Sequence, residues 1–252
     1  MNKRLFVLLP AVMLMLAGCG ETSESTDTTP TITPTTESTT ESTTEPVVEN
    51  SVKTAYEAGV ALATGKNTTD PSTFEGVVSA TCGNSFFVQD GDYGMYVYAG
   101  KTNYNVAIGK KVKVVATICD YNTLIETKSL TSVEILGDGT AVAAKTVSSA
   151  ADVSALKQNV LVDFVITLPS DAGTWSGSAA PIVKATLGSD TINVKFDKYG
   201  FTEEMGAIYA ANAGKKIKVT GAITTAYKSE ASDKAPNQLL VVGSTVLEAV
   251  AE

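Results

Sequence analysis

Aromatic side chains gather in two short segments of this 252-residue chain, at 85–90 (SFFVQD) and 94–99 (GMYVYA). Both segments alternate in the manner of β-strands, so successive side chains point to opposite faces. One face is apolar and consists of Phe86, Val88, Met95 and Val97; the other carries Phe87, Gln89, Tyr96 and Tyr98. Exposed rings can stack on nucleic-acid bases or on sugars, so we expect this second, aromatic face to bind a ligand. Ordinary packing against a neighbouring element is the alternative.

Lysines form the second group of residues that could bind a ligand. The segments Gly109-Lys110-Lys111-Val112-Lys113-Val114 and Gly214-Lys215-Lys216-Ile217-Lys218-Val219 echo each other, each with a Gly-led turn that feeds an alternating strand. Lys111 and Lys113 could contact phosphates beside the aromatic face, so they join it as candidate ligand residues. The missing Arg and the slightly negative charge of residues 51–252, which hold 17 Lys against 20 Asp and Glu, favour the alternative, in which these lysines form a solvated strand face.

Two residue types that often carry chemistry are missing or nearly so. The chain has no His, and its only Arg is Arg4. The commonest general base and metal ligand are therefore absent, and so is bidentate recognition of phosphate. The sequence contains no Ser–His–Asp or Cys–His set, no metal-ligand cluster and no phosphate-binding loop. We therefore predict a protein that is not an enzyme and that uses no cofactor or metal.

The first 18 residues have the pattern of an export signal. Lys3 and Arg4 precede the apolar run 5–16, which is shorter than the roughly 20 residues that a membrane span needs. The run leads into Leu16-Ala17-Gly18-Cys19, which resembles the lipobox of bacterial lipoproteins. The resemblance implies that Cys19 is acylated, with palmitate for example, and becomes the first residue of the mature chain. It also implies a lipid anchor in the cell membrane, with the protein on the extracytoplasmic face.

Residues 19–50 have a composition that does not favour folding. After Cys19 they are rich in Thr and Ser, with Glu and Pro and with neither Lys nor Arg. A segment with so few apolar side chains cannot offset the entropy lost on ordering. The sequence predicts a disordered linker that holds the folded part away from the membrane.

From residue 51 onward the pattern predicts one helix and then two similar series of strands. The helix is expected at 52–64 and a second, short one at about 203–212. The first series comprises strands at 74–81, 85–90, 94–99, 111–119, 124–128 and 131–136, and the second comprises strands at 160–168, 182–188, 191–197, 216–225 and 238–242.

Five strands with a long connection between the third and the fourth describe an OB-fold, a five-stranded Greek-key barrel. The predicted fold is all-β with short helices: two tandem OB-fold-like barrels, at 51–137 and 138–252. In the first copy, Phe74-Glu75-Gly76-Val77-Val78, Phe86-Phe87-Val88-Gln89-Asp90 and Gly94-Met95-Tyr96-Val97-Tyr98 resemble OB-fold modules associated with extracellular bacterial nucleases. The second copy lacks the last two segments, and its likeness depends on the order of elements and the lysine echo.

Cys82 and Cys119 are the two cysteines besides Cys19. An even pair in an exported protein suggests a disulfide. The two residues end the first and fourth strands, however, and these run antiparallel in an OB-fold. Their ends then lie at opposite poles of the barrel, beyond the roughly 7 Å that a disulfide spans between Cα atoms. The topology therefore favours free thiols.

The function predicted from these features is that of a non-enzymatic binding or scaffold module, tethered to the membrane through its lipid. One alternative is a nucleic-acid-binding accessory, which the family resemblance suggests and which the acidic charge and missing Arg oppose. Another is binding of an oligosaccharide or the cell wall through Phe87, Tyr96 and Tyr98. A protein partner is a further alternative.

Overall fold

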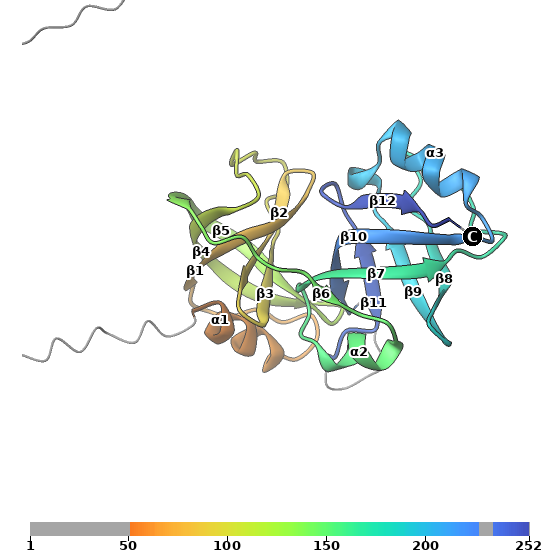
Figure 1. Cartoon of the computed structure of the whole chain (residues 1–252). Helices are drawn as coiled ribbons and strands as arrows, with labels where there is room; N and C mark the ends of the chain where they lie inside the picture. The colour runs from red at the N-terminus through yellow and green to blue at the C-terminus, as the bar shows by residue number, and fades with distance from the viewer. Residues whose placement is uncertain (1–50, 227–233, 252) are drawn as a thin grey trace, which may run out of the picture. The chain divides into compact units, whose positions relative to one another are not determined.

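The computed structural model describes residues 51–226 and 234–251, and the predicted signal peptide, Cys19 and linker lie outside them. The described chain is mostly β-structure and forms two closed five-stranded barrels that resemble OB-folds (Figure 1). The fold class predicted from the sequence is therefore confirmed. No helix in the described ranges has the length and apolar character that crossing a membrane would require.

The first barrel follows helix α1 (Ser51–Val60) and has the strand order β1-β2-β3-β5-β4, closed by pairing of β4 with β1. All of its pairings are antiparallel except that of β3 with β5, which is parallel. The strands are β1 (Ser72–Cys82), β2 (Ser85–Asp90), β3 (Tyr93–Val97), β4 (Lys110–Tyr121) and β5 (Leu124–Asp138). Alternation along β4 buries Val112, Val114, Ala116 and Ile118, and α1 adds Val52 and Tyr56 to the same core.

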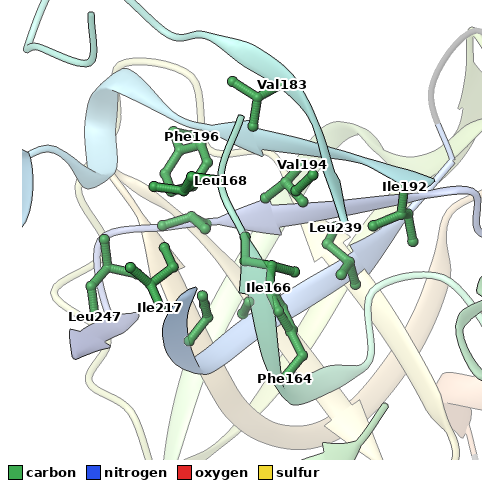
Figure 2. Close-up of a cluster of buried hydrophobic side chains, with 14 of the residues drawn as sticks. Phe164, Ile166, Leu168, Val183, Ile192, Val194, Phe196, Ile217, Leu239 and Leu247 are labelled. Carbon is green, nitrogen blue, oxygen red and sulfur yellow. The ribbon is translucent and has the colours of Figure 1, made fainter. Parts of the chain in front are cut away.

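The second barrel repeats this topology, with the order β7-β8-β9-β11-β10 closed by pairing of β10 with β7. Its third and fifth strands, β9 and β11, are again the parallel pair. The strands are β7 (Leu161–Thr167), β8 (Ile182–Leu187), β9 (Asp190–Phe196), β10 (Lys216–Thr225) and β11 (Gln238–Val241). Figure 2 shows its core, in which Phe164, Ile166, Val194, Phe196, Ile217 and Leu239 converge from these strands.

Short elements complete the second barrel. β6 (Lys145–Thr146) pairs with β7, and α2 (Ala150–Ala155) leads into it. The 3-10 helix η1 (Lys198–Gly200) and helix α3 (Glu203–Ala211) fill the long connection between the third and fourth strands. The side chain of Thr202 caps α3 by accepting a hydrogen bond from the N–H of Met205 at 3.1 Å, which fixes the start of this predicted helix.

The fifth strand differs from the prediction in both barrels. In the first barrel the two predicted strands at 124–128 and 131–136 are one strand, β5, which bends through register shifts against β4. In the second barrel the fifth strand is split. β11 pairs with β9 and with the end of β10, whereas β12 (Val246–Ala249), which we did not predict, pairs with the start of β10.

The break between β11 and β12 contacts the first barrel. The N–H of Gly243 donates to the carbonyl of Thr81 at 3.1 Å, and the N–H of Thr81 donates to the hydroxyl of Ser244 at 3.2 Å. The backbone groups that leave the strand ladder at the break are therefore partly satisfied by the end of β1.

The two similar Gly-Lys-Lys segments, 109–114 and 214–219, occupy the same place in both barrels. Gly109 and Gly214 both have positive φ, at 83° and 77°, and each ends the turn that precedes the fourth strand. Beyond them the apolar members of each echo, Val112 and Val114 in one and Ile217 and Val219 in the other, are fully buried. Lys111 and Lys113 therefore correspond to Lys216 and Lys218 on the outer surfaces of the two barrels.

Candidate functional site

The aromatic face of the first barrel lies against the second barrel. Phe86, Val88, Met95 and Val97 point into the barrel core as predicted. Phe87 points outward but is only 1% exposed, since it packs in a cluster with Ala80, Cys82, Leu161, Ile223 and Val242. The last three residues belong to the second barrel. The expectation that Phe87 faces a ligand is therefore wrong in this structure, because the neighbouring barrel occupies that surface.

Tyr96 and Tyr98 have different surroundings. The ring of Tyr96 stacks on that of Phe87, with centroids 4.7 Å apart and planes 25° apart, and it packs against the same cluster. Burial raises the pKa of Tyr96. Tyr98 lies beyond it, with ring centroids 6.4 Å apart, and is 50% exposed. Tyr98 is therefore the one member of the predicted aromatic face whose side chain remains largely open to solvent.

Gln89 also serves the contact between the barrels. Its Oε1 accepts a hydrogen bond from the N–H of Leu161 at 2.9 Å, and its Nε2 donates to the carbonyl of Gly91 at 2.9 Å. The side chain is buried. Its donor and acceptor are thus both used inside the protein, and the prediction that Gln89 binds a ligand is not supported by its position.

Further buried polar groups extend this contact, which we call the junction. Gln158 accepts from the N–H of Ile125 at 3.2 Å and donates to the carbonyls of Thr123 and Lys234 at 2.8 and 2.7 Å. Asn159 donates to the carbonyl of Ile125 at 2.9 Å. Oδ1 of the buried Asn159 has no hydrogen-bond partner among the described residues. The other bonds of this network favour one packing arrangement, because each displaced group would lose a partner away from water.

Lys111 and Lys113 lie on the outer surface of β4, beside acidic residues. Lys111 Nζ is 3.1 Å from a carboxylate oxygen of Glu75. Lys113 is paired in register with Glu75 on one side and with Glu134 on the other. Both lysines line a groove of about 520 Å³ together with Asp90 and Thr73. The groove is not a basic patch, which agrees with the sequence-based preference for a solvated strand face.

Cys82 and Cys119 are both buried and free within the described part of the chain. Burial raises the pKa of the Cys82 thiol to about 12 and that of the Cys119 thiol to about 11. A thiol must ionise to act as a nucleophile, so both groups are suited to packing rather than to reaction.

The surface of the second and third strands, which is buried on the first barrel, is exposed on the second barrel. Its second and third strands carry three outward cross-strand pairs, Ile182 with Lys195, Lys184 with Asn193 and Thr186 with Thr191. All of these side chains are exposed except that of Lys195, which is half-buried and lies 3.0 Å from Asp197. We call this surface the β8–β9 face. It includes a groove of about 540 Å³ between these strands and α2, lined by Ser154, Lys184, Asn193 and Asn237.

The structure separates the residues that were predicted to form one site. These are Phe87, Gln89, Tyr96, Tyr98, Lys111 and Lys113. Phe87, Gln89 and Tyr96 belong to the junction, Lys111 and Lys113 lie in the groove over β1 and β4, and Tyr98 is exposed. The β8–β9 face was missed because it has no aromatic residue. Its alternation, with Thr191, Asn193 and Lys195 outward, was the available signal.

No family model matches the chain, and no curated protein is significantly similar to it. Solved structures with similar folds include the tetrameric p202 HIN2, with 10% identity over 74% of this chain and 95% of that chain and a TM-score of 0.33. Fission yeast Pot1 with ssDNA gives 12% identity over 79% and 87%, with a TM-score of 0.33. A murine DNA-binding protein bound with ds DNA gives 12% identity over 73% and 98%, with a TM-score of 0.32. At these values the likeness concerns the arrangement of strands alone.

Proposed function

We propose that this chain is an exported, lipid-anchored and non-enzymatic binding protein, and that its β8–β9 face holds the ligand. The observation that carries the proposal is the unequal use of one surface in two barrels of the same topology. On the first barrel the surface of the second and third strands is buried in the junction. On the second barrel the same surface is exposed and grooved.

The side chains of the β8–β9 face favour a hydroxyl-rich ligand. Asn193, Thr186 and Thr191 offer both hydrogen-bond donors and acceptors, and Lys184 adds a cation. None of the outward residues on these two strands, all of which the structure describes, is aromatic. Base stacking, which carries much of the affinity for single-stranded nucleic acid, is therefore missing there. We infer that the ligand is an oligosaccharide of the cell envelope.

The anchor places such a binding face outside the cell membrane. The support for the anchor is the Leu16-Ala17-Gly18-Cys19 sequence and the apolar run before it. Two acyl chains on one cysteine would hold the protein at the membrane stably, since each buried methylene contributes about 0.8 kcal/mol. We therefore propose a membrane anchor, a polar linker and two barrels that pack against each other.

A binding screen with a non-acylated Cys19→Ser protein tests the proposed ligand class. We expect a subset of cell-wall oligosaccharides to bind, with an affinity that changes little with salt. The double substitution Lys184→Ala with Asn193→Ala should weaken binding at least about tenfold, which is about 1.4 kcal/mol. Lys101→Ala, at an exposed position of the first barrel, is the control. Binding of oligonucleotides that falls steeply with salt would instead identify a nucleic-acid ligand.

A further inference from the structure

A second groove crosses the outer surface of β7 and β10, on a different side of the second barrel from the β8–β9 groove. Its volume is about 480 Å³, and its floor is Val165, whose side chain is 44% exposed. Lys216 and Lys218 line it from β10. Asp163 and the hydroxyls of Thr146, Ser148, Thr167 and Thr186 also line it. Figure 1 shows β7 lying along β10 with β6 beside it. We call this the β7–β10 groove.

The internal repeat supplies a built-in comparison for this groove. Lys216 and Lys218 occupy the positions that Lys111 and Lys113 hold in the first barrel. Lys113 lies across from Glu75 on the first strand, and the residue in that position of the second barrel, across from Lys218, is Val165. Lys111 lies 3.1 Å from Glu75, whereas Lys216 lies across from Thr167. The repeat therefore keeps the lysines and replaces their acidic neighbour on the first strand by an apolar side chain.

The charges around the two lysines differ as a result. Lys218 is 2.8 Å from Glu248 on β12, a position that corresponds to Glu134 in the first barrel. The hydrogen bond to Glu248 raises the pKa of Lys218, which keeps it charged. Lys216 makes no ion pair with any residue in 51–226 or 234–251. An uncompensated ammonium at the edge of an apolar floor favours an anionic group of a ligand.

The other end of the groove has the opposite character. Asp163 accepts a hydrogen bond from the N–H of Gly221 at 2.8 Å through Oδ1. It lies four residues from Thr167 on β7, which is roughly 13 Å along a strand. Hydroxyl groups of Thr146, Ser148, Thr167 and Thr186 line the groove together with Val165. This length suits a disaccharide. The C–H groups of its rings would pack on Val165, its hydroxyl groups would bond to Asp163, and its carboxylate would pair with Lys216.

We propose that the β7–β10 groove binds an acidic disaccharide unit, in which a uronate carboxylate pairs with Lys216. The two grooves share no lining residue, although Thr186 of the β8–β9 face also lines the β7–β10 groove. Lys184 and Asn193 line only the β8–β9 groove, so substituting them separates the two proposals. The groove volume falls within the roughly 300–1,000 Å³ that is usual for small-molecule sites.

An NMR titration of isotopically labelled Cys19→Ser protein tests the proposal. Changes in the backbone amide chemical shifts are recorded for residues 51–226 and 234–251. The probes are a digalacturonate, a neutral disaccharide of the same linkage, and inorganic phosphate. We expect saturable shifts at Val165, Thr167 and Lys216 with digalacturonate only. Equal binding of the neutral disaccharide would show that Lys216 does not recognise the carboxylate. Saturation of the same amides by phosphate alone would show a general anion site, and no saturation by digalacturonate would refute the groove as its site.

Variants guided by the repeat sharpen this test. Lys216→Gln should lower the affinity for digalacturonate at least about tenfold, the loss expected for one charged hydrogen bond. Lys111→Gln, at the corresponding position of the first barrel, should leave it unchanged. Val165→Glu restores the acidic neighbour found in the first barrel and should abolish binding, with thermal unfolding as the check on the fold. Equal effects of Lys216→Gln and Lys111→Gln would overturn the assignment. The double substitution of Lys184 and Asn193 should leave digalacturonate binding at this groove intact, so failure of the β8–β9 proposal is separately visible.

Discussion

Lys234 Nζ lies 2.7 Å from Oδ2 of Asp120, and both side chains are buried. Asp120 belongs to β4 of the first barrel, whereas Lys234 precedes β11 of the second. The same ammonium donates to the carbonyls of Gly59, Val60 and Leu62, at 3.2, 2.9 and 2.5 Å, at the end of α1. A single cation of the second barrel therefore compensates a buried carboxylate and the C-terminal carbonyls of a helix in the first.

Replacement of Lys234 by Met should destabilise the protein strongly. Asp120 would be left as a buried charge without its cation, a situation that typically costs about 3–5 kcal/mol. The free energy of unfolding in urea measures the effect. Lys157→Met, at an exposed position of the second barrel, should change it by less than about 0.5 kcal/mol. A similar small loss for Lys234→Met would show that the ion pair is dispensable.

Truncation at the two ends of the aromatic stack should destabilise the protein to different extents. Phe87→Ala removes a fully buried ring from the junction and should cost about 3–5 kcal/mol of unfolding free energy. Tyr98→Ala removes a half-exposed ring, and we expect a much smaller loss. Thermal unfolding of the two variants, compared side by side, checks this. Equal stability of the two variants would mean that the second barrel does not cover Phe87 in solution.

Glu126 should make the stability fall as the pH rises. Burial raises the pKa of its carboxyl group to about 7. The folded protein therefore holds a proton that the unfolded chain, with a pKa of about 4.3, has released. The stabilisation linked to this proton is complete below about pH 4 and is lost as the pH rises from there to about pH 7, on the order of 3–4 kcal/mol in total.

Glu126→Gln should flatten that dependence and stabilise the protein at pH 8, since a neutral amide replaces a buried charge. Unfolding free energies at pH 5 and pH 8 provide the measurement. Glu134→Gln, at an exposed position of the same strand, is the control. If the stability of the parent protein did not fall over this interval, Glu126 would be ionised without penalty.

Replacement of Cys19 by Ser should release the protein from the membrane fraction. The serine hydroxyl cannot form the thioether that joins the acyl chains in bacterial lipoproteins, so the stable anchor is lost. Detergent partitioning of the two proteins after expression in a bacterium is the measurement. Cys82→Ser is the matched control and should leave the partitioning unchanged. Continued partitioning of Cys19→Ser into detergent would contradict the proposed anchor.

Most of the barrel architecture follows from local patterns in the sequence. The alternation of Val112, Val114, Ala116 and Ile118 defines a strand with one buried face, and glycines at positive φ mark the turns. The echo at Gly109 and Gly214 correctly relates the fourth strands of the two copies. These features depend only on residues close in sequence, which is why they could be predicted.

The site could not be predicted to the same extent, because its exposure depends on the other barrel. An outward Phe87 is compatible with a ligand or with a packed neighbour, and only the position of Leu161, Ile223 and Val242 decides between them. Likewise, the fifth strand is split into β11 and β12 where Gly243 bonds to Thr81, a residue far away in the sequence. Local alternation contains no information about such contacts.

The split fifth strand also determines how this protein can be divided into fragments. Residue 138 is the natural place to separate the two barrels, because β5 ends there. A fragment that starts after it would lose Thr81, the partner of Gly243 and Ser244, and would expose the apolar side chains of Leu161, Ile223 and Val242 that pack on the first barrel. Exposed apolar patches of this kind invite association with other chains. Isolated second barrels should therefore self-associate. The tandem pair is the smallest fragment suited to crystallisation or to fusion with another protein.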